Sequence, residues 1–255
     1  MTTPTIPDLT APLPSGAAMP LLGFGTWQIT GPTATTATAA ALSAGYRHVD
    51  TATVYTNEGE VGEALDGADV FLATKYPGDN RAPVRDTLQR SLELLRRDSV
   101  DLWLIHWPED SANVEVWREM IAAREAGLTK DIGVSNYSLD QLDELHTATG
   151  VMPAVNQIEW SPLLFDSHVL DGHRERGVVL EGYSALRGGT LEHPVITGIA
   201  ERLGRTPAQV IIRWHLQHGV VVIPKSEHPE RIASNADVGG FELAAEDMAA
   251  MDGLS

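Results

Sequence analysis

Residues 70–106 read VFLATKYPGDNRAPVRDTLQRSLELLRRDSVDLWLIH, and this stretch decides the fold class. VFLATK (70–75) and DLWLIH (101–106) are apolar runs without polar–apolar alternation, which is typical of parallel strands buried on both faces. Between them, residues 81–97 have the helical period, with apolar side chains on one stripe and Arg and Glu opposite. The stretch therefore predicts a strand, a helix and a strand in succession.

The same pattern continues along nearly the whole chain. Residues 114–126 form a second helical stripe, and Thr206-Pro207 predicts a helix start, since Thr caps well and Pro fits the first helical position. Eight strand–helix alternations predict a (β/α)8 TIM barrel that occupies residues 1–255 as a single domain, ahead of an open doubly wound sheet. The predicted strands are LLGFG (21–25), RHVD (47–50), VFLATK (70–75), DLWLIH (101–106), DIGVS (131–135), AVNQ (154–157), VVLEGY (178–183) and VVVIPK (220–225).

Length and composition fit one globular domain. The chain has 255 residues, of which 43% are hydrophobic and 21% charged. No apolar run reaches the roughly 18 residues of a membrane helix, and MTTPTIPDLT lacks the basic segment and apolar stretch of a secretory signal. Residues 1–18, rich in Thr, Pro and small side chains, predict a surface strand or hairpin that caps the main body.

Charge and cysteine content exclude several classes of function. With 18 basic and 35 acidic residues the net charge is −17, which argues against nucleic acid or an anionic membrane as a partner. A phosphate-bearing ligand would need a local basic patch, and the only lysines are Lys75, Lys130 and Lys225, of which Lys130 is expected to be structural. The absence of cysteine excludes thiolate mechanisms and cysteine-ligated zinc. The absence of cysteine also suits a reducing cytoplasm. We expect the protein to be a monomer.

Polar side chains end almost every predicted strand. The active site of a (β/α)8 barrel lies at the carboxyl ends of its strands. Several polar residues that meet at one rim therefore predict a site there. These strand-end residues are Asp50, Lys75, His106, Ser135, Asn136, Gln157, Tyr183 and Lys225.

Tyr55 follows Asp50 by five residues, in the loop before the next helix. Carbonyl reduction needs a hydride donor and an acid that protonates the developing alkoxide. A free tyrosine, with a pKa of about 10, is a poor acid at neutral pH, and a nearby Lys75 ammonium would lower that pKa by stabilising the phenolate. Asp50 would hold Lys75, and a neutral His106 would bind the substrate oxygen.

Each of these residues also has a simpler interpretation. Asp50 fits the cap of a helix that begins near Asn57, and Tyr55 fits an ordinary loop aromatic. Lys75 fits a surface lysine with a buried stem, and His106 fits a hydrogen-bonded core histidine. The joint placement favours a catalytic site without specifying its reaction.

Five stretches of the chain contain many of the candidate site residues in distinctive motifs: GYRHVDTATVYTNEGEVGEAL (45–65), DLWLIHWP (101–108), GVSNY (133–137), NQIEW (156–160) and IPKSEHPERIASN (223–235). They resemble motifs of the aldo-keto reductase family, in the family's order and from about Leu21 to the C-terminus. The resemblance implies a (β/α)8 barrel and NADP(H)-dependent reduction of aldehydes or ketones. It also implies a catalytic tetrad of Asp50, Tyr55, Lys75 and His106.

The cofactor would be held at the barrel rim. The chain has no P-loop, and Gly23-Phe24-Gly25 lacks the third glycine of G-x-G-x-x-G. The resemblance implies that Ser135, Asn136 and Gln157 hydrogen-bond the nicotinamide carboxamide. It also implies that Tyr183 stacks on the nicotinamide ring and that Ser184 and Leu186 lie along the pyrophosphate. The expected cofactor contacts at this end are Thr26, Asp50, Ser135, Asn136, Gln157, Tyr183, Ser184 and Leu186.

A small basic patch is expected at the other end of the cofactor. Lys225, Ser226 and Arg231 suit the 2′-phosphate of NADP, with Asn235 at the adenine. Ser226 is also placed to cap the short helix after Pro229, which would turn backbone N–H groups towards an anion. The alternative is a solvated lysine and an exposed arginine. Two of the three lysines nevertheless fall at expected site positions.

Trp27 and Trp107 would wall the substrate pocket beside Tyr55 and His106 by the same resemblance. From the sequence alone, a core position is equally compatible with both tryptophans. Trp160 has no assigned role.

The loops around the expected pocket are short. The stretch PEDSANVEVW (108–117) and the stretch after Tyr183 are brief, and the chain ends soon after AAEDMAAMDGL without a long tail. We therefore expect a shallow, open substrate site that accepts small aldehydes or activated ketones.

Three other classes compete with this interpretation. Short-chain dehydrogenases need Tyr-x-x-x-Lys, and none of the five tyrosines has Lys four residues on. A metal-dependent barrel hydrolase needs ligands at strand ends, whereas the His215/His218 and His168/His173 pairs fall in helical or loop segments and are expected at the surface. No metal site is predicted. A non-catalytic NADP(H)-binding sensor would keep the phosphate contacts and have no need of the tetrad.

Overall fold

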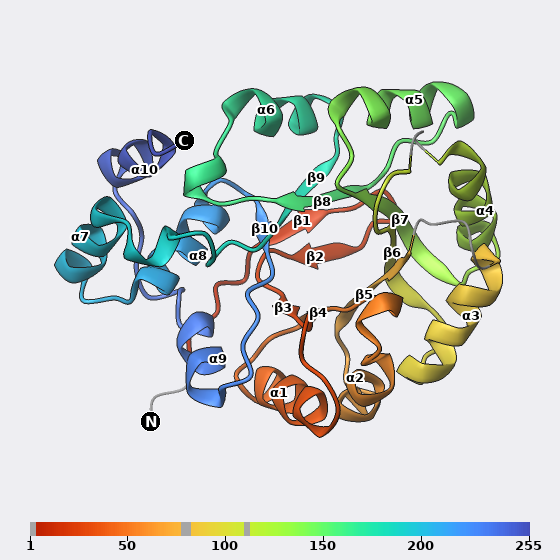
Figure 1. Cartoon of the computed structure of the whole chain (residues 1–255), viewed down its shortest axis with the longest axis horizontal. Helices are drawn as coiled ribbons and strands as arrows, with labels where there is room; N and C mark the ends of the chain where they lie inside the picture. The colour runs from red at the N-terminus through yellow and green to blue at the C-terminus, as the bar shows by residue number, and fades with distance from the viewer. Residues whose placement is uncertain (1–3, 78–82, 110–112) are drawn as a thin grey trace.

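Eight parallel strands form the centre of the computed structural model, which describes residues 4–77, 83–109 and 113–255 (Figure 1). Neighbouring strands follow chain order from first to last. A parallel bridge between Leu22 and Val222 joins the two edges, and the Gly23 N–H donates to the Val222 carbonyl at 2.9 Å. The predicted (β/α)8 barrel is confirmed. The strands are β3 (Phe24–Gly25), β4 (His48–Asp50), β5 (Phe71–Tyr76), β6 (Val100–Ile105), β7 (Thr129–Ser135), β8 (Val155–Glu159), β9 (Val179–Tyr183) and β10 (Val221–Val222).

Helices surround the sheet and follow the strands in turn, with α7 and α10 added beside α8 (Figure 1). The α-helices are α1 (Pro32–Ser43), α2 (Glu58–Leu65), α3 (Val84–Leu95), α4 (Val114–Glu125), α5 (Leu139–Thr149), α6 (Ser167–Glu175), α7 (Pro194–Leu203), α8 (Pro207–Gln217), α9 (Pro229–Ala236) and α10 (Ala245–Asp252). Short 3-10 turns are η1 (Thr53–Tyr55), η2 (Pro162–Leu164) and η3 (Thr190–Glu192).

Local sequence signals explain where these helices begin and end. α8 begins at Pro207 because the Thr206 side chain accepts the Gln209 N–H, and Gly219 follows the helix with a left-handed φ of 70°. The helix predicted over 81–97 is α3, and residues 81 and 82 of that prediction lie outside the described residues.

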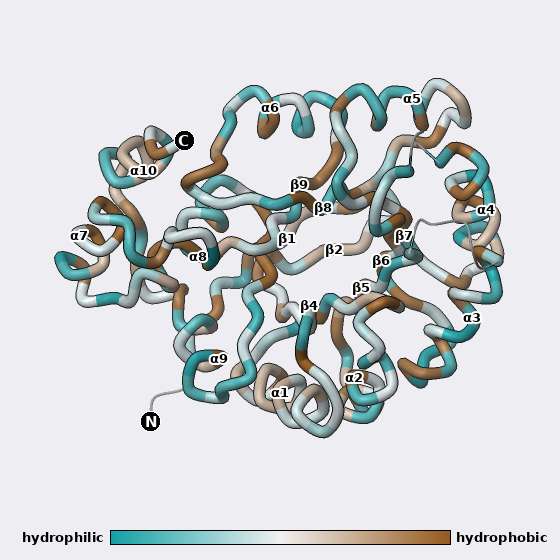
Figure 2. Tube along the Cα trace, viewed as in Figure 1, coloured by the Kyte–Doolittle hydropathy of each residue, from teal (hydrophilic) through white to brown (hydrophobic). Residues whose placement is uncertain are grey.

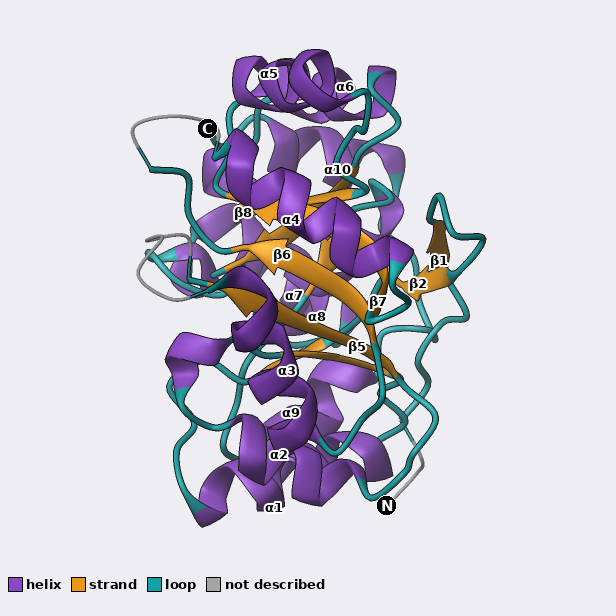
Figure 3. Ribbon diagram, turned by 90° about the vertical axis from the view of Figure 1, so that its right-hand side faces the viewer, coloured by secondary structure: helices purple, strands orange, loops and turns teal. Residues whose placement is uncertain are grey.

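The predicted N-terminal cap is a β-hairpin, β1 (Thr10–Pro12) with β2 (Ala18–Pro20), so its second strand runs two residues past the expected boundary. Residues 1–3 of the prediction lie outside the described part of the chain. The hairpin is fixed to the barrel by Ser15, whose N–H donates to Asp131 at 3.1 Å. Figure 3 shows it at the end of the barrel opposite the carboxyl ends of the strands. It therefore closes the bottom and leaves the rim open.

Apolar side chains fill the layer between sheet and helices. Trp103 and Trp117 are fully buried there, and α3 turns Leu88 and Leu95 inward. Figure 2 shows the outer turns of α5 and α6 as largely hydrophilic, in contrast to β9. Among the described residues, no helix is long and apolar enough to cross a membrane.

Candidate active site

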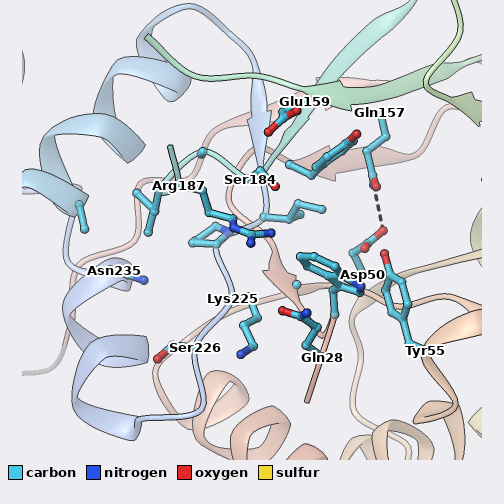
Figure 4. A pocket seen from close by; sticks show the side chains of 18 of the residues that line it. Gln28, Asp50, Tyr55, Gln157, Glu159, Ser184, Arg187, Lys225, Ser226 and Asn235 are labelled. Atoms are coloured by element: carbon cyan, nitrogen blue, oxygen red, sulfur yellow. Dashed lines mark hydrogen bonds between the residues drawn. The ribbon is translucent and has the colours of Figure 1, made fainter. Parts of the chain in front are cut away.

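A cavity of about 1030 Å³ opens at the carboxyl ends of the strands (Figure 4). Lys75 and Thr26, with 0% and 1% of their surface exposed, lie beneath its wall. The barrel thus brings nearly all of the predicted site residues to one cavity. Those that line it are Trp27, Asp50, Tyr55, His106, Trp107, Ser135, Asn136, Gln157, Tyr183, Ser184, Leu186, Lys225, Ser226, Arg231 and Asn235.

The floor of the cavity holds a buried ion pair between two neighbouring strands. Lys75 Nζ lies 2.6 and 2.7 Å from the two carboxylate oxygens of Asp50 and donates to the Thr51 carbonyl at 2.9 Å. Burial lowers the pKa of Lys75, but Asp50 and Tyr55 outweigh it, so the pKa lies above its ordinary value and the ammonium persists. Asp50 does not cap a helix: α2 follows Asn57, and Asp50 holds Lys75 instead.

Tyr55 lies over this pair. The Lys75 Nζ is 5.1 Å from the centroid of the Tyr55 ring, and the ring meets His106 edge-on at 5.6 Å between centroids. Burial raises the pKa of Tyr55, while the Lys75 charge and its hydrogen bond act downward. The predicted lowering by Lys75 is present, but burial outweighs it, so the phenol keeps its proton at neutral pH.

His106 is neutral in this environment. Burial first, and then the nearby Lys75 charge, lower the pKa of His106 to about 3. A neutral imidazole can orient a polar ligand atom without adding charge to the cavity floor.

Two threonine hydroxyls fix the short turn that carries Tyr55. The Thr53 hydroxyl donates to the Lys75 carbonyl at 2.9 Å, which ties η1 to β5. Behind it, the Thr74 hydroxyl donates at 2.6 Å to Glu58, the first residue of α2. Tyr55 is therefore held between two anchored elements, as a precise site requires.

Amide and hydroxyl groups gather on the side of the floor next to Asp50. The Gln157 amide donates to Asp50 at 3.0 Å, and the Ser135 hydroxyl donates to the Gln157 carbonyl at 2.8 Å. Tyr183 donates its hydroxyl proton to the Asn136 side chain at 2.7 Å. Figure 4 shows Gln157 pointing at Asp50 beside Tyr55.

Thr26 supports this region from below. Its hydroxyl donates to the Asp50 carbonyl at 2.9 Å, and its side chain is buried. The structure thus places Thr26 against the backbone of the tetrad and not at the cavity wall, and a cofactor contact for it stays a prediction.

The basic patch lies across the cavity from Tyr55 (Figure 4). Lys225 Nζ is 2.9 Å from a Glu227 carboxylate oxygen, and the buried Ser226 hydroxyl accepts the His228 N–H at 3.1 Å. The expected helix cap by Ser226 is wrong, because His228 occupies the position before α9 and no side chain of the described residues caps this helix. Arg231 and Asn235 project from α9 into the same end of the cavity.

Three non-glycine residues of the cavity wall have left-handed backbone. Gln28, Asn136 and Ser184 have φ of 61°, 66° and 57°. Such conformations cost on the order of 1–3 kcal/mol each and cluster at ligand sites. They re-aim the chain at the carboxyl ends of three strands.

Trp27 and Trp107 lie at the cavity, whereas Trp160 lies in the core. Trp27 and Trp107 line the cavity with 42% and 53% of their surface exposed, so the core alternative is wrong for both. Trp160 is core, with 2% exposed and its ring 5.8 Å from Phe165. Sequence reasoning missed Arg187, which lines the cavity with its guanidinium 5.1 Å from the Trp27 ring centroid. The sequence did offer a signal for Arg187, because it directly follows Leu186, which was an expected cofactor contact.

The candidate metal histidines have other roles. His215 and His173 are buried, which corrects the expected surface position; each hydrogen-bonds a backbone carbonyl of its own helix. His218 contacts Asp252 at 2.8 Å. Within the described residues, no cluster of three or more His, Cys, Asp or Glu side chains has the geometry to hold a metal ion.

Comparison with known proteins agrees with this geometry. The family model described as "Aldo/keto reductase family" matches residues 21–198 and 193–255. An aldo-keto reductase of Mycolicibacterium smegmatis is 44% identical over 95% of this chain and 92% of its own length. Methylglyoxal reductase DkgA of Escherichia coli is 41% identical over 92% of this chain and 90% of its own length. The chain belongs to the aldo-keto reductase family.

Solved structures extend the likeness to three dimensions. An aldo/keto reductase from Brucella melitensis superposes with a TM-score of 0.93 at 41% identity, covering 98% of this chain and all of that one. A mutant of Gox0644 in complex with NADPH has a TM-score of 0.93 at 39% identity, covering 97% of this chain and 94% of that one. The protein is thus an oxidoreductase-family barrel with an NADPH-bound homologue.

Proposed function

We propose that this protein reduces aldehydes or ketones to alcohols with NADPH, and that Tyr55 supplies the proton. One observation carries the proposal: the phenol of Tyr55 lies over the buried Asp50–Lys75 pair and edge-on to a neutral His106 at the floor of one open cavity. A protonated acid, a fixed positive charge and a neutral orienting group are the parts that proton delivery to a carbonyl oxygen needs.

Each residue has a distinct part in the proposed step. His106 and Tyr55 hold the carbonyl oxygen, and the proton moves from the Tyr55 hydroxyl to that oxygen as charge develops on it. Lys75, 5.1 Å from the ring centroid, stabilises the phenolate that remains. Asp50 keeps Lys75 beneath the ring. Burial of the pair excludes water that would screen this charge.

The lining of the cavity fits a dinucleotide phosphate. Uncharged donors at Ser135, Asn136 and Gln157 lie at the Tyr55 end, while Lys225 and Arg231 lie at the other. This polarity matches a neutral carboxamide at one end and phosphate at the other, although the whole chain carries a net charge of −17. When bound, NADPH supplies the hydride. Gln157 would hold the carboxamide while it also holds Asp50, and Lys225 would exchange Glu227 for phosphate.

The substrate end favours small or activated carbonyl compounds. Trp27, Val54 and Trp107 are exposed beside Tyr55, so the entrance is broad and apolar. The relative named methylglyoxal reductase is 41% identical, which makes dicarbonyls a natural part of the test panel. Residues 110–112 of the loop after His106 lie outside the described residues, and the expected shallow site stays a prediction.

NADPH oxidation against a panel of aldehydes, ketones and dicarbonyls tests the function, with Tyr55→Phe as the decisive variant. Because a positioned acid contributes about 10²–10⁴-fold, we expect turnover to fall at least about 100-fold while NADPH affinity stays within about twofold. Tyr46→Phe is the matched control, since Tyr46 is buried away from the cavity.

Unchanged turnover in Tyr55→Phe would refute the mechanism. NADPH binding without turnover of any carbonyl in the panel would instead favour the non-catalytic sensor, because that role needs Lys225 and Arg231 and not the tetrad.

A further inference from the structure

A carboxyl group lies buried beneath the tetrad without a counter-charge of its own. Glu181, in β9, has 0% of its surface exposed, and no hydrogen bond of normal geometry reaches either of its carboxyl oxygens within the described chain. Tyr183, two residues on, lines the cavity. Alternate residues of a strand share a face, so Glu181 points into the barrel one layer below. A buried polar group without a partner calls for a physical explanation.

The groups that surround Glu181 come from four elements. β4 contributes His48, whose Nε2 lies 3.7 Å from a Glu181 oxygen, and Asp50, whose negative charge disfavours ionisation of Glu181. β5 contributes Lys75, and β8 contributes the neutral amide of Gln157, directly opposite Glu181 in register. On the other side, β10 contributes only the apolar pair at residues 221 and 222.

Neither Lys75 nor His48 is available to neutralise an ionised Glu181. Lys75 already donates to both carboxylate oxygens of Asp50 and to the Thr51 carbonyl. Burial lowers the pKa of His48 to about 4, so its imidazole is neutral at physiological pH. A charge on Glu181 would therefore be buried and unpaired, which is strongly unfavourable.

We propose that Glu181 is a positioning residue that must carry its proton for the tetrad to work, and that loss of this proton ends the active pH range on the alkaline side. The inference rests on the proposed carbonyl reduction. An ionised Glu181 would compete with Asp50 for the Lys75 ammonium. Its negative charge would also oppose formation of the Tyr55 phenolate, because an ionised Glu181 raises the pKa of Tyr55.

The electrostatics place this transition in a measurable range. Burial first, and then Asp50, raise the pKa of Glu181 to about 8, against smaller opposing effects of Gln157 and Lys75. The pKa of Tyr55 is raised above its ordinary value. The two ionisations are therefore separated, and only that of Glu181 falls in the mildly alkaline range.

The test is the dependence of kcat on pH between about 6 and 10 for the wild type, Glu181→Gln and Glu181→Met. In the wild type, kcat should fall by up to about tenfold per pH unit above the pH at which Glu181 loses its proton. Neither variant has an ionisable group at position 181, so kcat of both should stay constant through that pH. Glu175→Gln, an exposed change on α6, should follow the wild type. An alkaline fall at the same pH in Glu181→Gln and Glu181→Met would overturn the proposal.

Stability gives a second readout that needs no turnover. An unfolded glutamate has a pKa of about 4.3, whereas the folded Glu181 has a pKa of about 8. Between these values the folded state binds more protons, so the free energy of unfolding of the wild type falls as pH rises. The stability of Glu181→Gln relative to the wild type should rise across this window and level off above it.

The two readouts separate failure of this inference from failure of the proposed function. A wild type that reduces no carbonyl at any pH would refute the function, while the stability comparison would still report the proton on Glu181. A stability difference that is constant from about pH 5 to 9 would overturn the inference even in an active enzyme.

Discussion

Replacing Lys75 by Met removes the charge at the centre of the site and keeps most of the volume. Lys75 has 0% and Asp50 has 2% of the side chain exposed, so water cannot replace the lost contacts. Three hydrogen bonds disappear, at 2.6, 2.7 and 2.9 Å. Among the described residues, the carboxylate of Asp50 then keeps only the Gln157 amide, at 3.0 Å, as a hydrogen-bond donor.

The expected loss follows from leaving one buried charge unpaired. Removing one partner of a buried ion pair costs about 3–5 kcal/mol. In a chain of this size each kcal/mol lowers Tm by about 2–4 °C, so Tm should fall by on the order of 10 °C. Turnover should fall at least about 100-fold, because Tyr55 loses the charge that stabilises its phenolate.

Thermal and urea unfolding of two further variants make the argument decisive. The double variant Asp50→Asn/Lys75→Met leaves no unpaired charge, so it should be more stable than Lys75→Met by at least about 1 kcal/mol. Lys130→Met breaks a pair of similar length, 2.7 Å to Asp101, but Lys130 is 57% exposed. Its loss should stay below about 1 kcal/mol. A Lys75→Met protein no less stable than Lys130→Met would refute the reasoning.

Two further predictions concern the cofactor end and the scaffold. Lys225→Met should weaken NADPH binding about tenfold in calorimetry, the worth of one charge-assisted hydrogen bond, and leave NADH nearly unchanged; an equal loss for both would contradict a 2′-phosphate contact. Ser138→Ala removes the hydroxyl that accepts the Gln141 N–H at the start of α5, and should cost about 1 kcal/mol in urea unfolding. Ser43→Ala, which only bonds back to Ala39 within α1, should cost clearly less.

The rim of the site was predictable because a barrel of parallel strands turns sequence position into spatial position. Asp50, Lys75 and His106 each close an apolar run, and all three runs are parallel strands of the barrel, so their ends meet. The chemistry of these side chains, together with the family motifs, then indicated the reaction. Helix starts with a polar cap were equally accessible, as Thr206 demonstrates.

What the sequence did not reveal depends on backbone direction and side-chain reach. Nothing in GYSALRGG indicates that Ser184 adopts a left-handed backbone or that Arg187 reaches the ring of Trp27. Histidines in helices looked exposed because their helical register relative to the sheet was unknown; His215 and His173 face inward. Glu181 was passed over inside an apolar strand, although its spacing of two from Tyr183 held the signal.

Burial shifts the pKa values of several ionisable groups in and beneath the tetrad, and these shifts together determine how activity depends on pH. Burial disfavours the charged imidazoles and lowers the pKa of His106 to about 3 and that of His48 to about 4. Tyr55 and Lys75 have pKa values raised above their ordinary ones. Between these limits Glu181, at about 8, is the member of the cluster with a shifted pKa in the working range. A single alkaline fall in activity, absent from Glu181→Gln, is therefore what this arrangement of buried groups predicts, and the breadth of the plateau below it follows from the two neutral histidines.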